Sequence, residues 1–113
     1  MAKADFDAGR QAHAEWLGNF KALITSKSKV EPDMISNVNS TFGKWYYSEG
    51  KEKYGSSKSM QDIEYQNKKL HQLANDIYSM QLAGDESLPD WLTDELNTTS
   101  AKIIDLLNKS EQE

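Results

Sequence analysis

Apolar residues recur at helical spacing in the first quarter of the chain. Residues three, four or seven positions apart lie on one face of an α-helix, so this spacing predicts a long amphipathic helix. The stripe consists of Phe6, His13, Trp16, Leu17, Phe20, Leu23 and Ile24. The pattern is lost from Thr25 to Val30. Pro32 then marks a boundary, because proline restricts the backbone of the residue before it.

A second, shorter helix is expected a few residues later. Asn39 or Ser40 can cap its N-terminus, since short polar side chains accept hydrogen bonds from the first turn of a helix. Its apolar side consists of Phe42, Trp45 and Tyr46. Glycine and serine gather at 48–50 and at 54–57, which predicts a loop before the next helix.

The third pattern is the clearest. Its apolar stripe alternates spacings of three and four over Met60, Ile63, Asn67, Leu70, Ala74 and Ile77. His71 and Tyr78 flank that stripe. Residues 59–62 resemble a capping box at the start of this helix, and Gly84 is expected to close it as a C-cap.

Residues 87–90 are expected to open a fourth helix. Its stripe, with similar spacing, is formed by Leu92, Leu96, Thr99, Ile103 and Leu106. Heptad-like stripes on helices joined by short links are typical of antiparallel bundles. The expected fold class is therefore all-α. We expect an antiparallel four-helix bundle of three long helices and one short helix around Phe42–Tyr47, forming a single domain over residues 1–113.

The composition narrows the function classes. The chain has 113 residues, a net charge of −5 and a single arginine, Arg10. Nucleic acid is not an expected partner, because proteins bind it through clustered Arg and Lys. The lack of cysteine excludes disulfides, thiol nucleophiles and cysteine-based zinc sites. No apolar run is long enough for a bilayer span or a secretory signal, so we expect a cytoplasmic protein without a membrane partner. With two histidines and no nucleophile–base pair suggested by spacing, we expect no enzyme activity.

Three polar residues lie on or beside the predicted apolar faces. A lone histidine such as His13 or His71 is more often a satisfied core residue than a ligand, although two on neighbouring helices favour a shared site. Two imidazoles alone do not complete a structural zinc site. Asn67 is either a buried residue that fixes helix register or a position that once held a ligand.

The aromatic run around residue 45 is unusual for a generic bundle. Gly43 precedes three consecutive aromatic residues, and glycine is disfavoured inside helices unless a neighbouring backbone comes close. The three tryptophans are interpreted as packing in the core or at helix junctions. They are Trp16, Trp45 and Trp91.

These motifs resemble those of the chemoreceptor zinc-binding (CZB) domain, a domain family found in bacterial chemoreceptors and diguanylate cyclases. The resemblance is carried by His13 followed by Trp16, by the run from Phe42 to Gly50, and by Leu70 with His71. Members of that family bind zinc through three histidines and one cysteine. The resemblance thus implies the helical fold and a sensory setting.

The resemblance also implies which residues occupy the metal-ligand positions. His13 and His71 match two of the histidines, whereas Ser40 stands in place of the cysteine and Asn67 in place of the remaining histidine. A hydroxyl and an amide are far poorer zinc ligands than a thiolate and an imidazole. We therefore expect an incomplete site with no cofactor or weakly bound zinc, in which these four side chains form a buried polar cluster.

The first functional hypothesis is a non-enzymatic sensory or regulatory module of a bacterial cytoplasmic signalling protein with a degenerate zinc site. Its expected partners are a second copy of the chain, in a homodimer, and the signalling output domain of the parent protein. One alternative is a reversible zinc sensor that uses His13 and His71 plus water or a carboxylate. Another is a plain helical scaffold for dimerisation.

Overall fold

A computed structural model describes residues 3–25, 36, 40–84 and 90–112. Every regular element among them is helical, which confirms the all-α fold class. The elements are α1 (Lys3–Thr25), α3 (Thr41–Trp45), the π-helical segment η1 (Tyr46–Gly50), α4 (Lys51–Tyr54), α5 (Lys58–Leu82) and α6 (Asp90–Gln112). Within the described residues, no helix combines the length and the apolar character that crossing a membrane requires.

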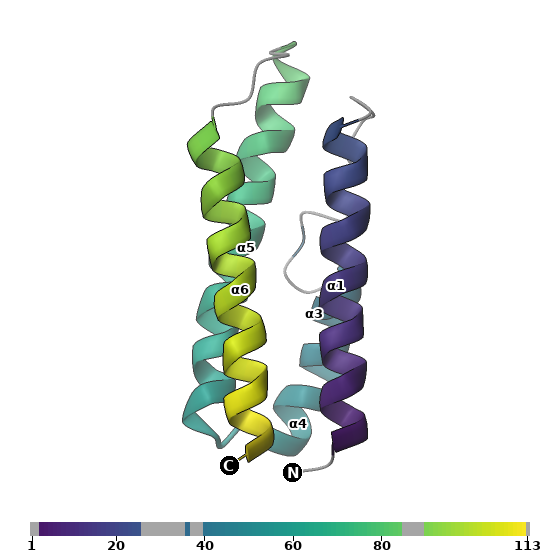
Figure 1. Ribbon diagram of the computed structural model, residues 1–113, viewed down its shortest axis with the longest axis vertical. Coiled ribbons are helices and arrows are strands. Elements are labelled where there is room, and N and C mark those ends of the chain that lie inside the picture. Colours follow the sequence, from purple (N-terminus) through teal and green to yellow (C-terminus); the bar gives the residue numbers. More distant parts are fainter. Residues whose placement is uncertain (1–2, 26–35, 37–39, 85–89, 113) are drawn as a thin grey trace.

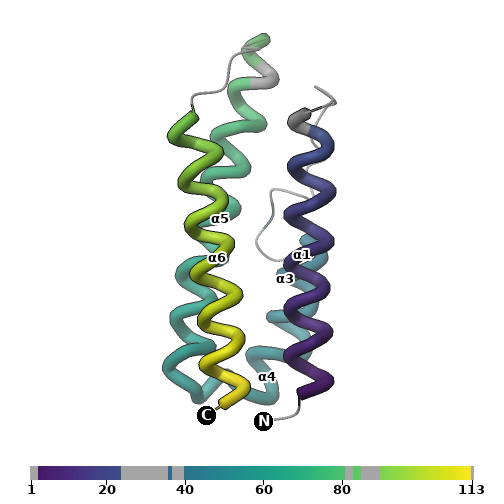
Figure 2. The backbone as a smooth tube through the Cα atoms, in the orientation of Figure 1, coloured from purple at the N-terminus to yellow at the C-terminus, as the bar shows by residue number. Residues whose placement is uncertain are grey.

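The helices lie along one long axis, and the molecule measures 45 × 22 × 18 Å. From the N-terminal end of α1, the path runs up α1, back down through α3, η1 and α4, up α5 and down α6 (Figure 1). The backbone tube shows the same course, with the beginning of α1 and the end of α6 at one end of the molecule (Figure 2). This arrangement encloses the apolar faces between the helices.

The predicted stripe of α5 lies in the core, and so does the part of the α1 stripe formed by Phe6, His13, Trp16 and Phe20. Leu17 and Leu23 are only partly buried, and the side chain of Ile24 is outside the described part. On α5, all six stripe residues have no exposed surface. On α1, the fully buried aromatic residues are Phe6, Trp16 and Phe20, with His13 among them. From the middle of the chain, the core receives Phe42, Trp45 and Tyr46.

Two predictions for α6 are corrected by the structure. Leu107 is fully buried, whereas Leu106 is only partly buried, because after Ile103 the 3.6-residue period continues by four positions rather than three. Trp91, which we expected in the core or at a helix junction, is 60% exposed. It directly precedes the buried Leu92 and therefore lies about 100° around the helix from the apolar stripe.

The segment between α3 and α5 also differs from the prediction. Residues 48–50 are helical rather than a loop, because the π-helical segment continues directly from α3 into α4. Gly50 permits this, since its backbone packs so closely that an added Cβ would lie 3.0 Å from Met60 Cε and from the Trp45 ring. Of the loop predicted at 54–57, residues 55–57 do form a turn, whereas Tyr54 is the last residue of α4.

The helix ends show where side chains cap the backbone. Ser40 is the N-cap of α3. On α5 the N-cap is Ser57, whose Oγ accepts a hydrogen bond from the backbone N–H of Met60 at 3.5 Å. The helix therefore begins at Lys58, one residue before the capping box predicted at 59–62. Gly84 follows α5 with a φ of +79°, as expected of a C-cap. The predictions for residues 26–35, for Asn39 and for the opening residues 87–89 fall outside the described part.

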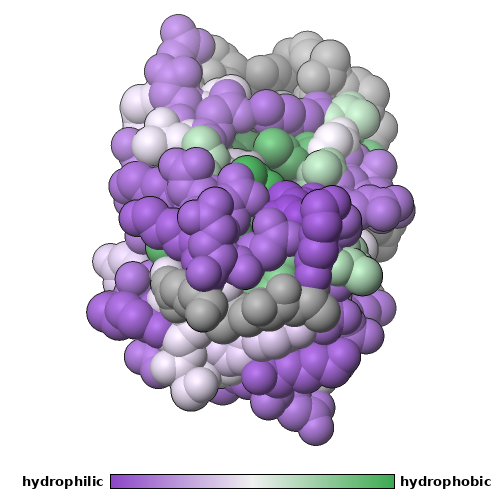
Figure 3. Space-filling model, turned by 60° about the horizontal axis from the view of Figure 1, so that its bottom comes forward, coloured by the Kyte–Doolittle hydropathy of each residue, from purple (hydrophilic) through white to green (hydrophobic). Residues whose placement is uncertain are grey.

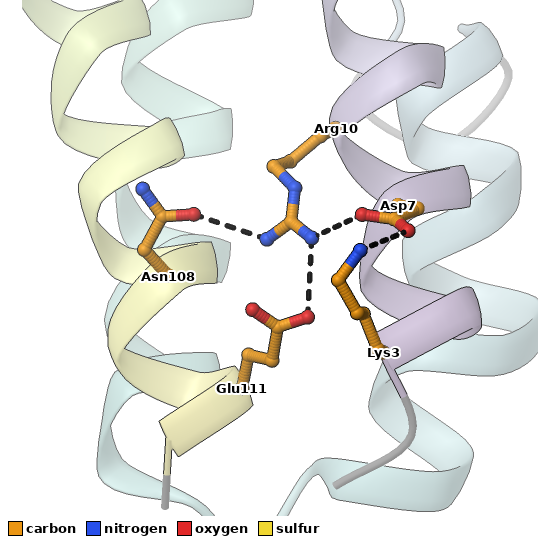
Figure 4. Close-up of polar contacts among 5 residues, drawn as sticks. All are labelled: Lys3, Asp7, Arg10, Asn108 and Glu111. Carbon is orange, nitrogen blue, oxygen red and sulfur yellow. Dashed lines mark hydrogen bonds and ion pairs between the residues drawn. The ribbon is translucent and has the colours of Figure 1, made fainter.

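The end of the molecule that carries both termini faces the viewer in Figure 3, and hydrophilic side chains cover most of the surface seen there. On this end, Arg10 joins α1 to α6: its Nη1 donates to Asn108 Oδ1 at 3.0 Å and its Nη2 to Glu111 Oε1 at 3.1 Å (Figure 4). Asp7 also accepts from Arg10, which lowers the pKa of that carboxyl below its ordinary value. We call Arg10, Asp7, Asn108 and Glu111 the Arg10 clasp.

Candidate functional site

His13 of α1 is buried, with 1% of its surface exposed. Its ring packs edge-on against Phe42, with 5.3 Å between centroids. Desolvation by this burial lowers the pKa of His13 from 6.5 to about 4, so the imidazole is neutral at pH 7. Its Nε2 is 2.6 Å from Ser100 Oγ on α6, so a buried hydrogen bond links the two helices.

Ser40 connects the cap of α3 to the second histidine. Its Oγ accepts from the backbone N–H of Gly43 at 3.2 Å and is also 3.2 Å from Nε2 of His71 on α5. Because the hydroxyl uses a lone pair for the capping interaction, its proton is available for donation to His71 Nε2. The local sequence accounts for this position, since serine is a preferred N-cap residue.

The indole of Trp16 lies near both histidines. Its ring centroid is 4.8 Å from that of His71 at a steep angle, and 6.3 Å from that of His13 in a stacked arrangement. The structure therefore brings His13, His71 and Ser40 together in one buried region around Trp16. Asn67 has no exposed surface and lies four residues before His71, one turn away on the same face of α5.

Sequence reasoning missed Ser100, which contributes from α6. The residue is 5% exposed, and its neighbour Thr99 is completely buried. A signal for Ser100 was present, since it stands four residues after Leu96 and three before Ile103, both of which are buried. The predicted stripe passed through Thr99, so the adjacent serine was not considered as an inward-facing residue.

The donor set does not suit a tight zinc ion. Within the described residues, no three or more His, Cys, Asp or Glu side chains gather where they could hold a metal. The two buried imidazoles are accompanied by serine hydroxyls and an amide, and each imidazole already has its Nε2 within hydrogen-bond distance of a hydroxyl. Structural zinc requires four strong ligands, so the residues present do not fit such a site.

The structure thus places two buried histidines among aromatic rings inside a helical fold. The model of the chemoreceptor zinc-binding domain (CZB) matches residues 13–78, more than half of the chain. The chain therefore belongs to the CZB family of sensory zinc-binding domains in signalling proteins. No curated protein and no solved structure matches it. The matched range includes His13, Ser40, Asn67 and His71, whereas Ser100 lies beyond it.

Proposed function

We propose that this chain is a non-enzymatic sensory or regulatory module of a bacterial cytoplasmic signalling protein, of the chemoreceptor or diguanylate cyclase type. In this proposal residues 1–113 form a single antiparallel four-helix bundle whose zinc site is degenerate. The family match supports the sensory role, and the site supports the loss of tight metal binding. A homodimer and an output domain of the parent protein are the partners that this role requires.

The observation that carries the proposal is the hydrogen bond between Ser40 and His71. Ser40 occupies the position of the family's cysteine, and its Oγ is 3.2 Å from a histidine at another ligand position. A neutral hydroxyl that also caps α3 is a hydrogen-bonding group and not a strong metal ligand. A hydrogen bond thus links two of the proposed ligand positions.

The chemistry that remains is hydrogen bonding inside the domain. Buried polar groups destabilise a fold unless they find partners, and a satisfied polar cluster fixes one arrangement of helices. Here Ser40 joins the start of α3 to α5, while Ser100 joins α6 to α1. In this proposal these two hydrogen bonds therefore help to hold α1, α3, α5 and α6 in one arrangement.

The test is the metal content of protein purified without a polyhistidine tag. We predict that zinc is absent or far below one equivalent after dialysis against buffer with a trace of free zinc, because only two of the four ligand positions hold imidazole. Elemental analysis of the dialysed protein measures this. Nearly one equivalent of retained zinc would contradict the proposal.

A reversible zinc sensor is a second candidate function. The observation in its favour is that both His13 and His71 approach Trp16, while the lowered pKa of His13 keeps that imidazole unprotonated at neutral pH. Two imidazoles with water or a carboxylate would release the metal readily. In that case zinc should bind weakly and saturably and should be lost in both His13→Gln and His71→Gln.

A further inference from the structure

The pair of helices α5 and α6 carries an open groove on its surface. The two helices lie side by side and run in opposite directions, with α1 and α3 on the other side of the molecule (Figure 1). The groove has a volume of about 320 Å³. Its lining includes Asp62 and Tyr65 from α5, and Lys102, Asp105, Leu106 and Lys109 from α6.

Two large hydrophobic side chains of the described part are exposed, and both belong to this pair of helices. Tyr65, which is 68% exposed, lines the groove itself. Trp91 precedes Glu95 by four residues and Lys102 by eleven, and these spacings place all three on one face of α6. That face is turned toward α5, because Glu95 forms an ion pair with Lys69 at 3.5 Å. The α5–α6 surface thus presents to solvent the two aromatic residue types that are enriched at protein interfaces.

The charges of the groove indicate which partner fits it. The lining holds two carboxylates and two lysines, so it is neutral, whereas the whole chain carries a net charge of −5. A strongly acidic or strongly basic partner would meet as many like charges as opposite ones. A second copy of the chain brings the same mixture of charges, and in a twofold interface each favourable contact is made twice.

We propose that the α5–α6 surface is the face through which two copies of this chain associate, with the twofold axis parallel to the groove. This axis places α5 of each copy opposite α6 of the other, at the same level along the helices. Asp62 of one copy then faces Lys102 and Lys109 of the second copy, and the exposed rings of Tyr65 and Trp91 become covered. The inference rests on the homodimer in the proposed function, and it adds the face that forms the dimer.

The free chain has the size and the open charges that this pairing requires. One side of a molecule that measures 45 × 22 × 18 Å has room for the roughly 800 Å² per partner that a standard interface buries. Asp62 also accepts from Lys58 of its own helix at 2.7 Å, and a carboxylate has lone pairs for a second cation. Its side chain is 44% exposed and can therefore be reached by a second copy.

The first test is the mass of the chain in solution, measured by sedimentation equilibrium in the micromolar range at neutral pH. We expect a wild-type dimer. Tyr65→Asp should raise the dimer dissociation constant by about tenfold or more, because it replaces an aromatic contact with a charge. Circular dichroism establishes that the variant is folded, as the exposure of Tyr65 in the single chain leads us to expect.

The second test reverses charges on the two sides of the proposed contact. Asp62→Lys and Lys102→Glu should each weaken the homodimer, because like charges then face each other twice. An equimolar mixture of the two variants should restore a dimer, since every altered charge meets an opposite one on the other variant. Lys44→Glu is the matched control: Lys44 is exposed on α3, away from this face, and its replacement should leave the dimer unchanged.

The outcomes separate this inference from the proposed function. A monomeric wild type would overturn the proposed face together with the homodimer, and would leave the zinc measurement to decide the nature of the site. A dimer that both Tyr65→Asp and Lys102→Glu leave intact would overturn the face alone, because the copies would then associate elsewhere. A mixture of the charge variants that stays monomeric would overturn the twofold pairing of Asp62 with Lys102.

Discussion

Burial sets the charge state of His13. The ring is almost completely withdrawn from water and lies beside the aromatic rings of Trp16 and Phe42. Desolvation disfavours the imidazolium, which lowers the pKa of His13 to about 4. In the unfolded chain the imidazole is hydrated and its pKa is about 6.5. The folded protein therefore binds fewer protons than the unfolded chain between these two values.

The sign of the resulting pH dependence follows from this difference. We predict that the free energy of unfolding is unaffected by His13 above pH 6.5 and falls by up to about 3 kcal/mol as the pH approaches 4. Chemical denaturation followed by tryptophan fluorescence across that interval measures the loss. His13→Gln removes the titrating group and should lose this part of the pH dependence. Equal pH slopes in the two proteins would show that His13 does not titrate from a buried site.

The packing of α1 against the middle segment depends on a glycine. Gly9 is buried, and an added Cβ would lie 2.8 Å from the ring of Trp45, closer than real Cβ contacts. Gly50 also comes close to that ring, since an added Cβ would lie 3.0 Å from it. Gly43, where close approach was expected, is itself buried in α3. The Trp45 ring thus packs closely against the backbone at two glycines.

A pair of substitutions on α1 tests this packing. Gly9→Ala should give a protein less stable than Gly18→Ala by about 1–3 kcal/mol, because the methyl group added at position 9 overpacks the core. Gly18 has no atom within 4 Å of an added Cβ, so its replacement measures the helix-propensity gain alone, about 1 kcal/mol. Urea denaturation of both variants provides the difference. Equal stabilities would mean that Trp45 can move without cost.

Element types were largely predictable from the sequence, because apolar periodicity depends on local spacing. The stripe of α5 is buried at every predicted position, Asn67 included. The helical path of residues 46–50 was not predictable, since Gly50 resembles a loop residue until its packing against Trp45 and Met60 is known. Ser100 was missed for a related reason: which face of α6 meets His13 depends on how whole helices pair.

At the scale of the whole molecule, two buried hydrogen-bonded pairs connect elements that are distant in the sequence. His13 comes from α1, Ser40 from the start of α3, His71 from α5 and Ser100 from α6. The Arg10 clasp adds a part-buried ion pair between α1 and α6, which salt is expected to weaken. The family match includes Ser40, Asn67 and both histidines, and the donor chemistry of these residues is the basis for the proposed loss of tight zinc binding.

The most direct test of this account restores the two altered ligand positions. Zinc affinity is measured by competition with a chromophoric chelator for the wild type and for the Ser40→Cys/Asn67→His double variant. We predict that the double variant binds one equivalent far more tightly than the wild type, because a thiolate and a third imidazole complete the four-ligand set. A folded double variant without zinc, or a wild type that binds zinc equally tightly, would contradict the account.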